Sequence, residues 1–157
     1  MISIFYKVYQ RIIALLIKSS IIILKLLLPN KLMAHTFDEF FPLKKIKTNK
    51  GGIIFLCLGK LPLFRAETFF EKEPETIKWI EEFKPKTVFW DIGANIGIYS
   101  IYAGLNPTSN IFAFEPASNN FNLLNQNIKI NKMGKNISAL SLAFSNKTQI
   151  NKFYMSD

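Results

Sequence analysis

The chain has 157 residues, of which 49% are hydrophobic, enough for the core of one ordinary domain and too many for a disordered tail. Its single cysteine, Cys57, excludes an intrachain disulfide, and its single histidine, His35, leaves no Cys/His cluster, so we expect no metal site. The net charge is +9, but residues 1–50 hold nine of the twenty basic residues and two of the eleven acids, which leaves only +2 for the other 107 residues. We therefore expect no nucleic-acid partner. His35 lies in a linker, and we interpret it as a solvated residue without a role.

The N-terminal segment is apolar with regularly spaced basic residues. RIIALLIKSSIIILKLLLP, residues 11–29, predicts a helix on which Arg11, Lys18, Lys25 and the earlier Lys7 fall within about 40° of one another. A narrow basic stripe facing an apolar surface is typical of a helix lying in a membrane interface. We expect residues 1–34 to contact a membrane surface, with the protein cytoplasmic and peripheral at the inner face. A true span, or packing on this protein or a second copy, is the alternative.

The middle of the chain contains a connector, a strand and a helix. Residues 37–50 have no clean period, so we assign 1–50 as a basic helical segment with its connector and 51–157 as the folded domain. GGIIFLCLG, residues 51–59, predicts a strand with Cys57 as a small core residue. EKEPETIKWIEEF, residues 71–83, predicts a helix with Pro74 in its first turn.

Alternating strands and helices follow. Residues 87–92 are continuously apolar up to Asp91, which predicts a strand buried on both faces of a parallel sheet. The pattern continues with a turn at 93–97, a helix at 96–103, a loop at 104–110, a strand at 111–115, a helix opened by Pro116 with Ser118 as its cap, a strand at 137–145, and a last strand ending in Phe153 and Tyr154. This β-α-β-α-β order predicts a Rossmann-like, doubly wound α/β fold.

Two acids and two glycines mark the expected ligand site. The turn reads D-x-G-x-N-x-G at Asp91, Gly93, Asn95 and Gly97, and Asn95 breaks the G-x-G-x-x-G pattern of a nicotinamide-binding turn. Glu115 follows the next strand, 22 residues after Gly93, where a carboxylate can accept both hydroxyls of a ribose. One acid for an amino-acid group and one for a ribose describe S-adenosylmethionine. The alternative is that both acids cap helices or pair with lysines.

The same residues carry a family resemblance. VFWDIGANIGIYSIYAG, IFAFEPASNNFNLLNQNIKIN and the upstream RAETFFEKEPETIKWIEEF resemble FkbM-type S-adenosylmethionine-dependent methyltransferases over residues 65–154. The resemblance implies a class I methyltransferase fold with Asp91, Gly93, Ala94, Asn95 and Gly97 at the methionine end of the cofactor and Glu115 at its ribose. It also implies O-methylation of a sugar or another small hydroxylated acceptor, a small molecule or a glycan.

The chain departs from the family in three places. The family often has an acid near Asn146, and it carries a later D-x-E-G stretch and further strands that this chain lacks. We therefore expect an incomplete domain, its cofactor-binding half, and identify no catalytic residue. A noncatalytic fragment that attaches to a membrane or partner is the alternative, and a reductase-like nucleotide-binding domain is a third. The sequence does not indicate an oligomeric state.

Overall fold

A computed structural model describes residues 2–30, 32, 41–150, 152 and 154, which leaves His35 and residues 37–40 of the predicted connector outside the described part. The chain divides into two units, Met1–Phe41 and Pro42–Asp157. The boundary lies near residue 41 because residues 43–48, predicted as connector, belong to the folded unit.

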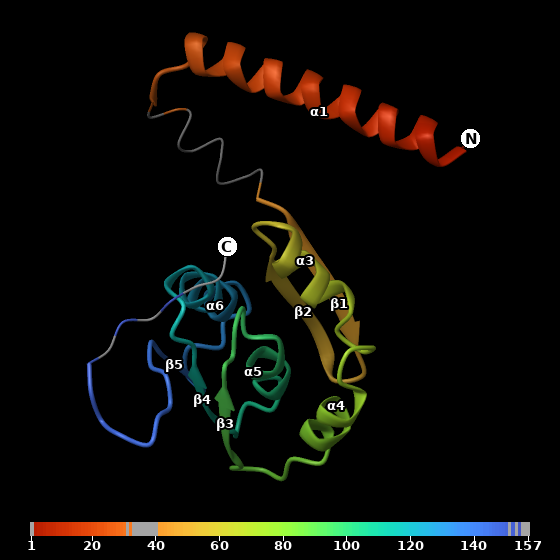
Figure 1. The fold of residues 1–157 in the computed structure, drawn as a ribbon. Helices are drawn as coiled ribbons and strands as arrows, with labels where there is room; N and C mark the ends of the chain where they lie inside the picture. The colour runs from red at the N-terminus through yellow and green to blue at the C-terminus, as the bar shows by residue number, and fades with distance from the viewer. Residues whose placement is uncertain (1, 31, 33–40, 151, 153, 155–157) are drawn as a thin grey trace. The chain divides into compact units, whose positions relative to one another are not determined.

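The first unit contains one long helix, α1 (Ile2–Leu27), drawn red to orange in Figure 1. It begins nine residues before the predicted start at Arg11. Most of its described apolar side chains are exposed, and Lys7, Arg11, Lys18 and Lys25 are exposed as well. Within the described residues, no helix combines the length and the apolarity that crossing a membrane requires.

The second unit opens with a hairpin of β1 (Leu43–Thr48) and β2 (Gly51–Leu56), which pair antiparallel with Ile46 opposite Ile53. The prediction of a connector over β1 was wrong. Lysines occupy three of the six positions of β1, and Ile46 is its one buried residue, so the strand shows no apolar alternation. Cys57 follows β2 and is buried, which confirms it as a core residue; burial raises the pKa of its thiol.

Two short helices connect the hairpin to the main sheet. The first, α3 (Lys60–Glu67), packs against β1 and was not predicted. The second, α4 (Pro74–Glu81), has Pro74 in its first turn as predicted but is shorter than the expected 71–83. Ile77 and Ile80 on its inner face are buried, and α4 contacts the helix α5 (Ile98–Ala103).

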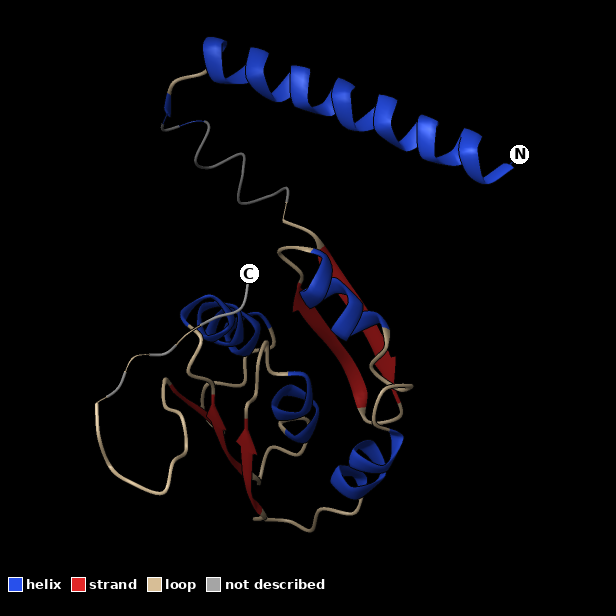
Figure 2. Ribbon diagram, in the orientation of Figure 1, coloured by secondary structure: helices blue, strands red, loops and turns tan. Residues whose placement is uncertain are grey.

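The main sheet has the strand order β3-β4-β5 with all strands parallel: β3 (Val88–Ile92), β4 (Asn110–Phe114) and β5 (Ile137–Leu140). Helix α5 (Ile98–Ala103) connects β3 to β4, and α6 (Ser118–Ile130) connects β4 to β5 (Figure 2). The predicted α/β class and the β-α-β-α-β order are confirmed. Strand β5 is shorter than the predicted 137–145, and no strand occurs among residues 141–150, 152 and 154, so the predicted last strand is absent from the described residues.

The sheet is covered on one face along β3. Helix α5 packs on β3 and β4, and α6 packs on β5; Phe89 and Asp91 are buried. The alternate residues Val88, Trp90 and Ile92 are 55–60% exposed, so the prediction that this strand is buried on both faces was wrong. Trp90 contacts the rings of Phe114 and Phe144, at 5.5 Å and 5.9 Å between centroids.

Two asparagines, Asn127 in α6 and its C-cap Asn131, hold the hairpin. Asn131 binds Ile54 through both halves of its amide: Oδ1 accepts from the backbone N–H and Nδ2 donates to the carbonyl. Asn127, which is fully buried, accepts from the backbone N–H of Leu56 and donates to the carbonyl of Ile96. Asn127 therefore links α6 at once to the hairpin and to the turn after β3.

Candidate functional site

The two predicted acids lie at the carboxyl ends of neighbouring strands. Ile92 is aligned with Phe114, so Asp91 lies near the end of β3 and Glu115 directly follows β4. The carbonyl of Phe114 accepts hydrogen bonds from the backbone N–H groups of Gly93 and Ala94, both 2.9 Å. These bonds close the turn across the two strand ends, the place where ligands bind in parallel α/β sheets.

Asp91 is a buried carboxylate, 7% exposed, that bonds through one oxygen. Its Oδ2 accepts from the backbone N–H of Ser100 at 3.0 Å and from the Ser100 hydroxyl at 2.5 Å. Burial raises the pKa of Asp91, and the nearby carboxylates of Glu115 and Glu73 raise it further. Among the described residues, every hydrogen bond to this side chain ends on Oδ2, which leaves Oδ1 for a ligand.

Glu115 uses both of its oxygens inside the protein. Oε2 accepts from the backbone N–H of Asn95 and Oε1 from that of Ala117, both at 2.8 Å, and the side chain is 5% exposed. The predicted cap Ser118 is the first residue of α6 and Ala117 is the N-cap, with no side-chain capping bond from it. Glu115 thus holds the turn after β3 against the start of α6.

The two glycines of the motif do different things. Gly93 has a φ of 81°, is exposed, and a Cβ built on it meets nothing within 4 Å. Gly97 has a φ of 89°, is buried, and a Cβ there would lie 2.6 Å from Leu124 Cδ1 on α6. Gly93 leaves room for a ligand, whereas Gly97 leaves room for a helix.

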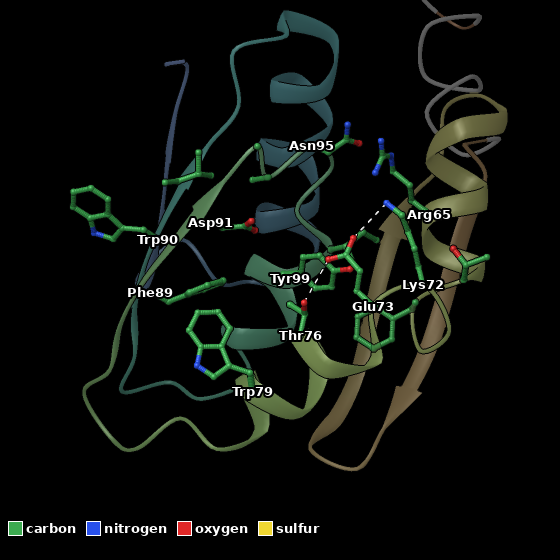
Figure 3. Close-up of a pocket in the computed structure, with 16 residues that line it drawn as sticks. Arg65, Lys72, Glu73, Thr76, Trp79, Phe89, Trp90, Asp91, Asn95 and Tyr99 are labelled. Atoms are coloured by element: carbon green, nitrogen blue, oxygen red, sulfur yellow. Dashed lines mark hydrogen bonds and ion pairs between the residues drawn. The ribbon is translucent and has the colours of Figure 1, made fainter. Parts of the chain in front are cut away.

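A cavity of about 380 Å³ opens beside this turn (Figure 3). Four of the six predicted site residues line it: Asp91, Gly93, Ala94 and Asn95. Gly97 and Glu115 do not. The structure therefore brings four of the five residues predicted for the methionine end together around one cavity, and Glu115 bonds the backbone of the turn instead of lining it.

The opposite wall was not predicted from the sequence. It comes from α3, α4, the segment between them, and α5, and its polar members are Arg65, Thr68, Lys72, Glu73, Thr76 and Tyr99. Figure 3 shows this wall facing Asp91 and Asn95. Glu73 pairs with Lys72 at 3.5 Å and accepts from the Thr76 hydroxyl at 3.4 Å. The only sequence signal for this wall was the family resemblance of residues 65–83, upstream of the glycine turn.

Tyr99 joins the two sides of the cavity. Burial raises the pKa of its hydroxyl, and so do a hydrogen bond to the Glu73 carboxylate and the charges of Glu73 and Asp91. Tyr99 is consequently a proton donor to Glu73 at neutral pH. Within the part of the chain that the structure describes, no group of three His, Cys, Asp or Glu side chains is arranged to hold a metal ion.

No family model and no curated protein matches the chain. Solved structures share part of its fold. The precorrin-6Y C5,15-methyltransferase of Geobacter metallireducens is 26% identical over 46% of this chain and 38% of its own, with a TM-score of 0.41. The tRNA m1G37 methyltransferase of M. jannaschii is 21% identical over 64% of this chain and 30% of its own, with a TM-score of 0.46. The chain thus spans well under half the length of these proteins.

One expectation is corrected by these structures. A third similar structure is aTrm5 in complex with tRNALeu, 20% identical over 66% of this chain and 28% of its own, with a TM-score of 0.47. Proteins that share part of this fold therefore include one solved with a nucleic acid bound. The sequence-based expectation of no nucleic-acid partner was therefore wrong as an exclusion.

Proposed function

We propose that Pro42–Asp157 binds S-adenosylmethionine and is the cofactor-binding part of a class I methyltransferase. The observation that carries the proposal is the environment of Asp91, a buried carboxylate with one oxygen left over, beside the open backbone of Gly93 in a cavity at the strand ends. A carboxylate there repels the pyrophosphate of a dinucleotide and attracts an ammonium group. The ribose role of Glu115 stays a prediction, since its oxygens already bond the turn.

Calorimetric titration of the full chain tests this proposal. We expect S-adenosylhomocysteine, the demethylated and chemically stable form of the cofactor, to bind, and a nicotinamide dinucleotide not to bind. Asp91→Asn is expected to weaken the first interaction because the ammonium loses a charged partner. Binding of the dinucleotide in place of S-adenosylhomocysteine would contradict the proposal and favour the reductase-like alternative.

The acceptor follows from the FkbM resemblance alone. We propose O-methylation of a sugar or another small hydroxylated compound, with the acceptor oxygen held in line with the methyl group. The test is transfer of a labelled methyl group from S-adenosylmethionine to a panel of hydroxylated sugars, with a tRNA pool as a second arm. Labelling of tRNA without labelling of any sugar would refute this acceptor class and leave cofactor binding in place.

A second proposed function concerns α1. The helix is continuous over 26 residues, and its four basic residues share one stripe beside exposed apolar side chains. We propose that it binds the surface of an anionic membrane. Flotation with anionic vesicles should therefore decrease in the double variant Lys18→Glu/Lys25→Glu and not in the control Lys132→Glu/Lys135→Glu. Unchanged flotation of the first variant would contradict the proposal.

A further inference from the structure

Arg65 is a cation in the cavity wall that forms no ion pair among the described residues. Its Nε is buried and has no hydrogen-bond partner. Figure 3 shows the side chain reaching from α3 toward Asn95. A buried N–H without an acceptor is costly, so such a group in a ligand cavity indicates an acceptor that the ligand supplies.

The other charges of the cavity complement this cation. Glu73 and Asp91 carry negative charge, and Arg65 and Lys72 carry positive charge, so the four side chains sum to zero. Lys72 is already paired with Glu73, whereas Arg65 is unpaired. A ligand group that is neutral overall and carries both signs matches this set better than a phosphate or a simple cation.

The charge of Glu73 disfavours the charged form of Asp91 across the cavity. The charge of Glu73 contributes to the raised pKa of Asp91, and Tyr99 donates a hydrogen bond to Glu73 from the same side. An ammonium group has three N–H donors and relieves the repulsion between two carboxylates when it bonds both. A guanidinium binds a carboxylate through two parallel hydrogen bonds.

We propose that Arg65 binds the α-carboxylate of the methionine part of the cofactor, and that Glu73 together with Asp91 binds its α-ammonium group. This inference rests on the proposed function and assigns two residues outside the glycine turn to the same site. It makes the segment of α3 and the α3–α4 connection the specificity element for an amino-acid group. The glycine turn then faces the rest of the ligand.

The test uses three ligands that differ only at the amino-acid end. S-adenosylhomocysteine has both charged groups, decarboxylated S-adenosylhomocysteine lacks the carboxylate, and 5′-methylthioadenosine lacks both. Each is titrated calorimetrically into the full chain and into Arg65→Met and Glu73→Gln. Lys60→Met, on the same helix but outside the cavity, and Glu75→Gln, on α4, are matched controls that are exposed and make the same change of charge.

Arg65→Met is expected to lower the affinity for S-adenosylhomocysteine about 10- to 100-fold, which is the range for losing a hydrogen bond between charged groups. The affinities for the other two ligands should not change. Glu73→Gln is expected to lower the affinity for the two ligands that keep the ammonium group and to leave the affinity for 5′-methylthioadenosine unchanged. The control variants should bind all three ligands as the unchanged chain does.

If Arg65→Met lowers the affinity for all three ligands equally, or does not lower the affinity for S-adenosylhomocysteine, the assignment of the carboxylate is overturned. A Glu73→Gln variant that binds decarboxylated S-adenosylhomocysteine at full strength would overturn the assignment of the ammonium group. If the unchanged chain binds none of the ligands, the proposed function itself fails, and this inference fails with it. Binding of 5′-methylthioadenosine by every variant separates the two cases, because it reports cofactor binding without the amino-acid group.

Discussion

Replacing each glycine of the turn by alanine separates its folding role from its ligand role. Gly93 and Gly97 lie four residues apart and have nearly the same φ, 81° and 89°. Each alanine therefore meets the same backbone penalty, roughly 1–2 kcal/mol for a left-handed conformation. Each also gains about 0.4–1 kcal/mol from restriction of the unfolded chain. The net backbone cost is roughly 0–1.5 kcal/mol at both positions, and the surroundings determine the difference.

The surroundings differ sharply. The Cβ at position 93 meets no atom within 4 Å, whereas the Cβ at position 97 would lie 2.6 Å from Cδ1 of Leu124 and 3.5 Å from Ile101. Leu124 is fully buried, so its methyl group cannot swing into solvent, and α6 has to shift or the leucine has to leave its rotamer. Overpacking of this kind costs about 1–3 kcal/mol. Gly97→Ala should therefore lose about 1–3 kcal/mol more unfolding free energy than Gly93→Ala.

Urea unfolding followed by circular dichroism measures the stability difference, and calorimetry with S-adenosylhomocysteine measures binding by the folded protein. We expect Gly93→Ala to unfold near the wild-type midpoint but to bind about tenfold more weakly, because its methyl group stands in the cavity wall. Folded Gly97→Ala should bind like wild type. Equal stability losses in the two variants, or a binding loss confined to Gly97→Ala, would refute the distinction.

Three further predictions concern the buried polar groups. Burial raises the pKa of Asp91 in the folded protein above its value in the unfolded chain. At pH values between these two pKa values the folded protein binds more protons than the unfolded chain, so the free energy of unfolding falls as the pH rises through this range. Asp91→Asn keeps an acceptor for Ser100, so its urea midpoint at pH 7 should equal or exceed the wild-type value, without this pH dependence; a lower midpoint would contradict the reasoning. Asn127→Leu leaves two buried backbone groups unpaired and should cost about 2–5 kcal/mol of unfolding free energy, against little change for the exposed Asn125→Leu, which keeps α6 intact. Glu115→Gln turns an amide N–H toward one of two backbone donors and should cost about 1–3 kcal/mol in the same assay; a neutral effect would show that the turn does not depend on this carboxylate.

The sequence predicted the elements whose signal is local. The apolar run of β3, the glycine turn and the strand before Glu115 each carry their own pattern, and these elements formed in the predicted order. Strand β1 and helix α3 were missed because each buries one residue, Ile46 and Ala66, so neither shows a periodic apolar face. Their positions depend on packing against each other and, for β1, on pairing with β2, which are contacts that no pattern within either element reports.

The residues that line the cavity also divide into those that a sequence motif predicts and those that only the fold brings together. Asp91, Gly93, Ala94 and Asn95 are consecutive or nearly so, and a motif predicted them together. Arg65 and Glu73 come from a segment about 20 residues earlier, and only the fold brings them opposite Asp91. Charged residues in a polar helix give no sign of which ones face a cavity, so spacing alone could not select them from their neighbours.

The two acids of the site show why residue type and strand position do not determine a carboxylate's role. Asp91 and Glu115 end adjacent parallel strands, are almost equally buried, and were predicted to grip two parts of one ligand. Asp91 lines the cavity and accepts both of its bonds on one oxygen, from a single serine, so that its other oxygen has no bond among the described residues. Glu115 is one methylene longer, and its two oxygens reach two separate backbone N–H groups, on the turn and on α6. A carboxylate that satisfies backbone donors on two elements stabilises the loop geometry, whereas one anchored by one residue can still receive a ligand's proton donors. The number of backbone donors within reach, set by tertiary packing, is therefore the basis for our proposal that Asp91 binds the ligand, and it explains why Glu115 holds the turn instead.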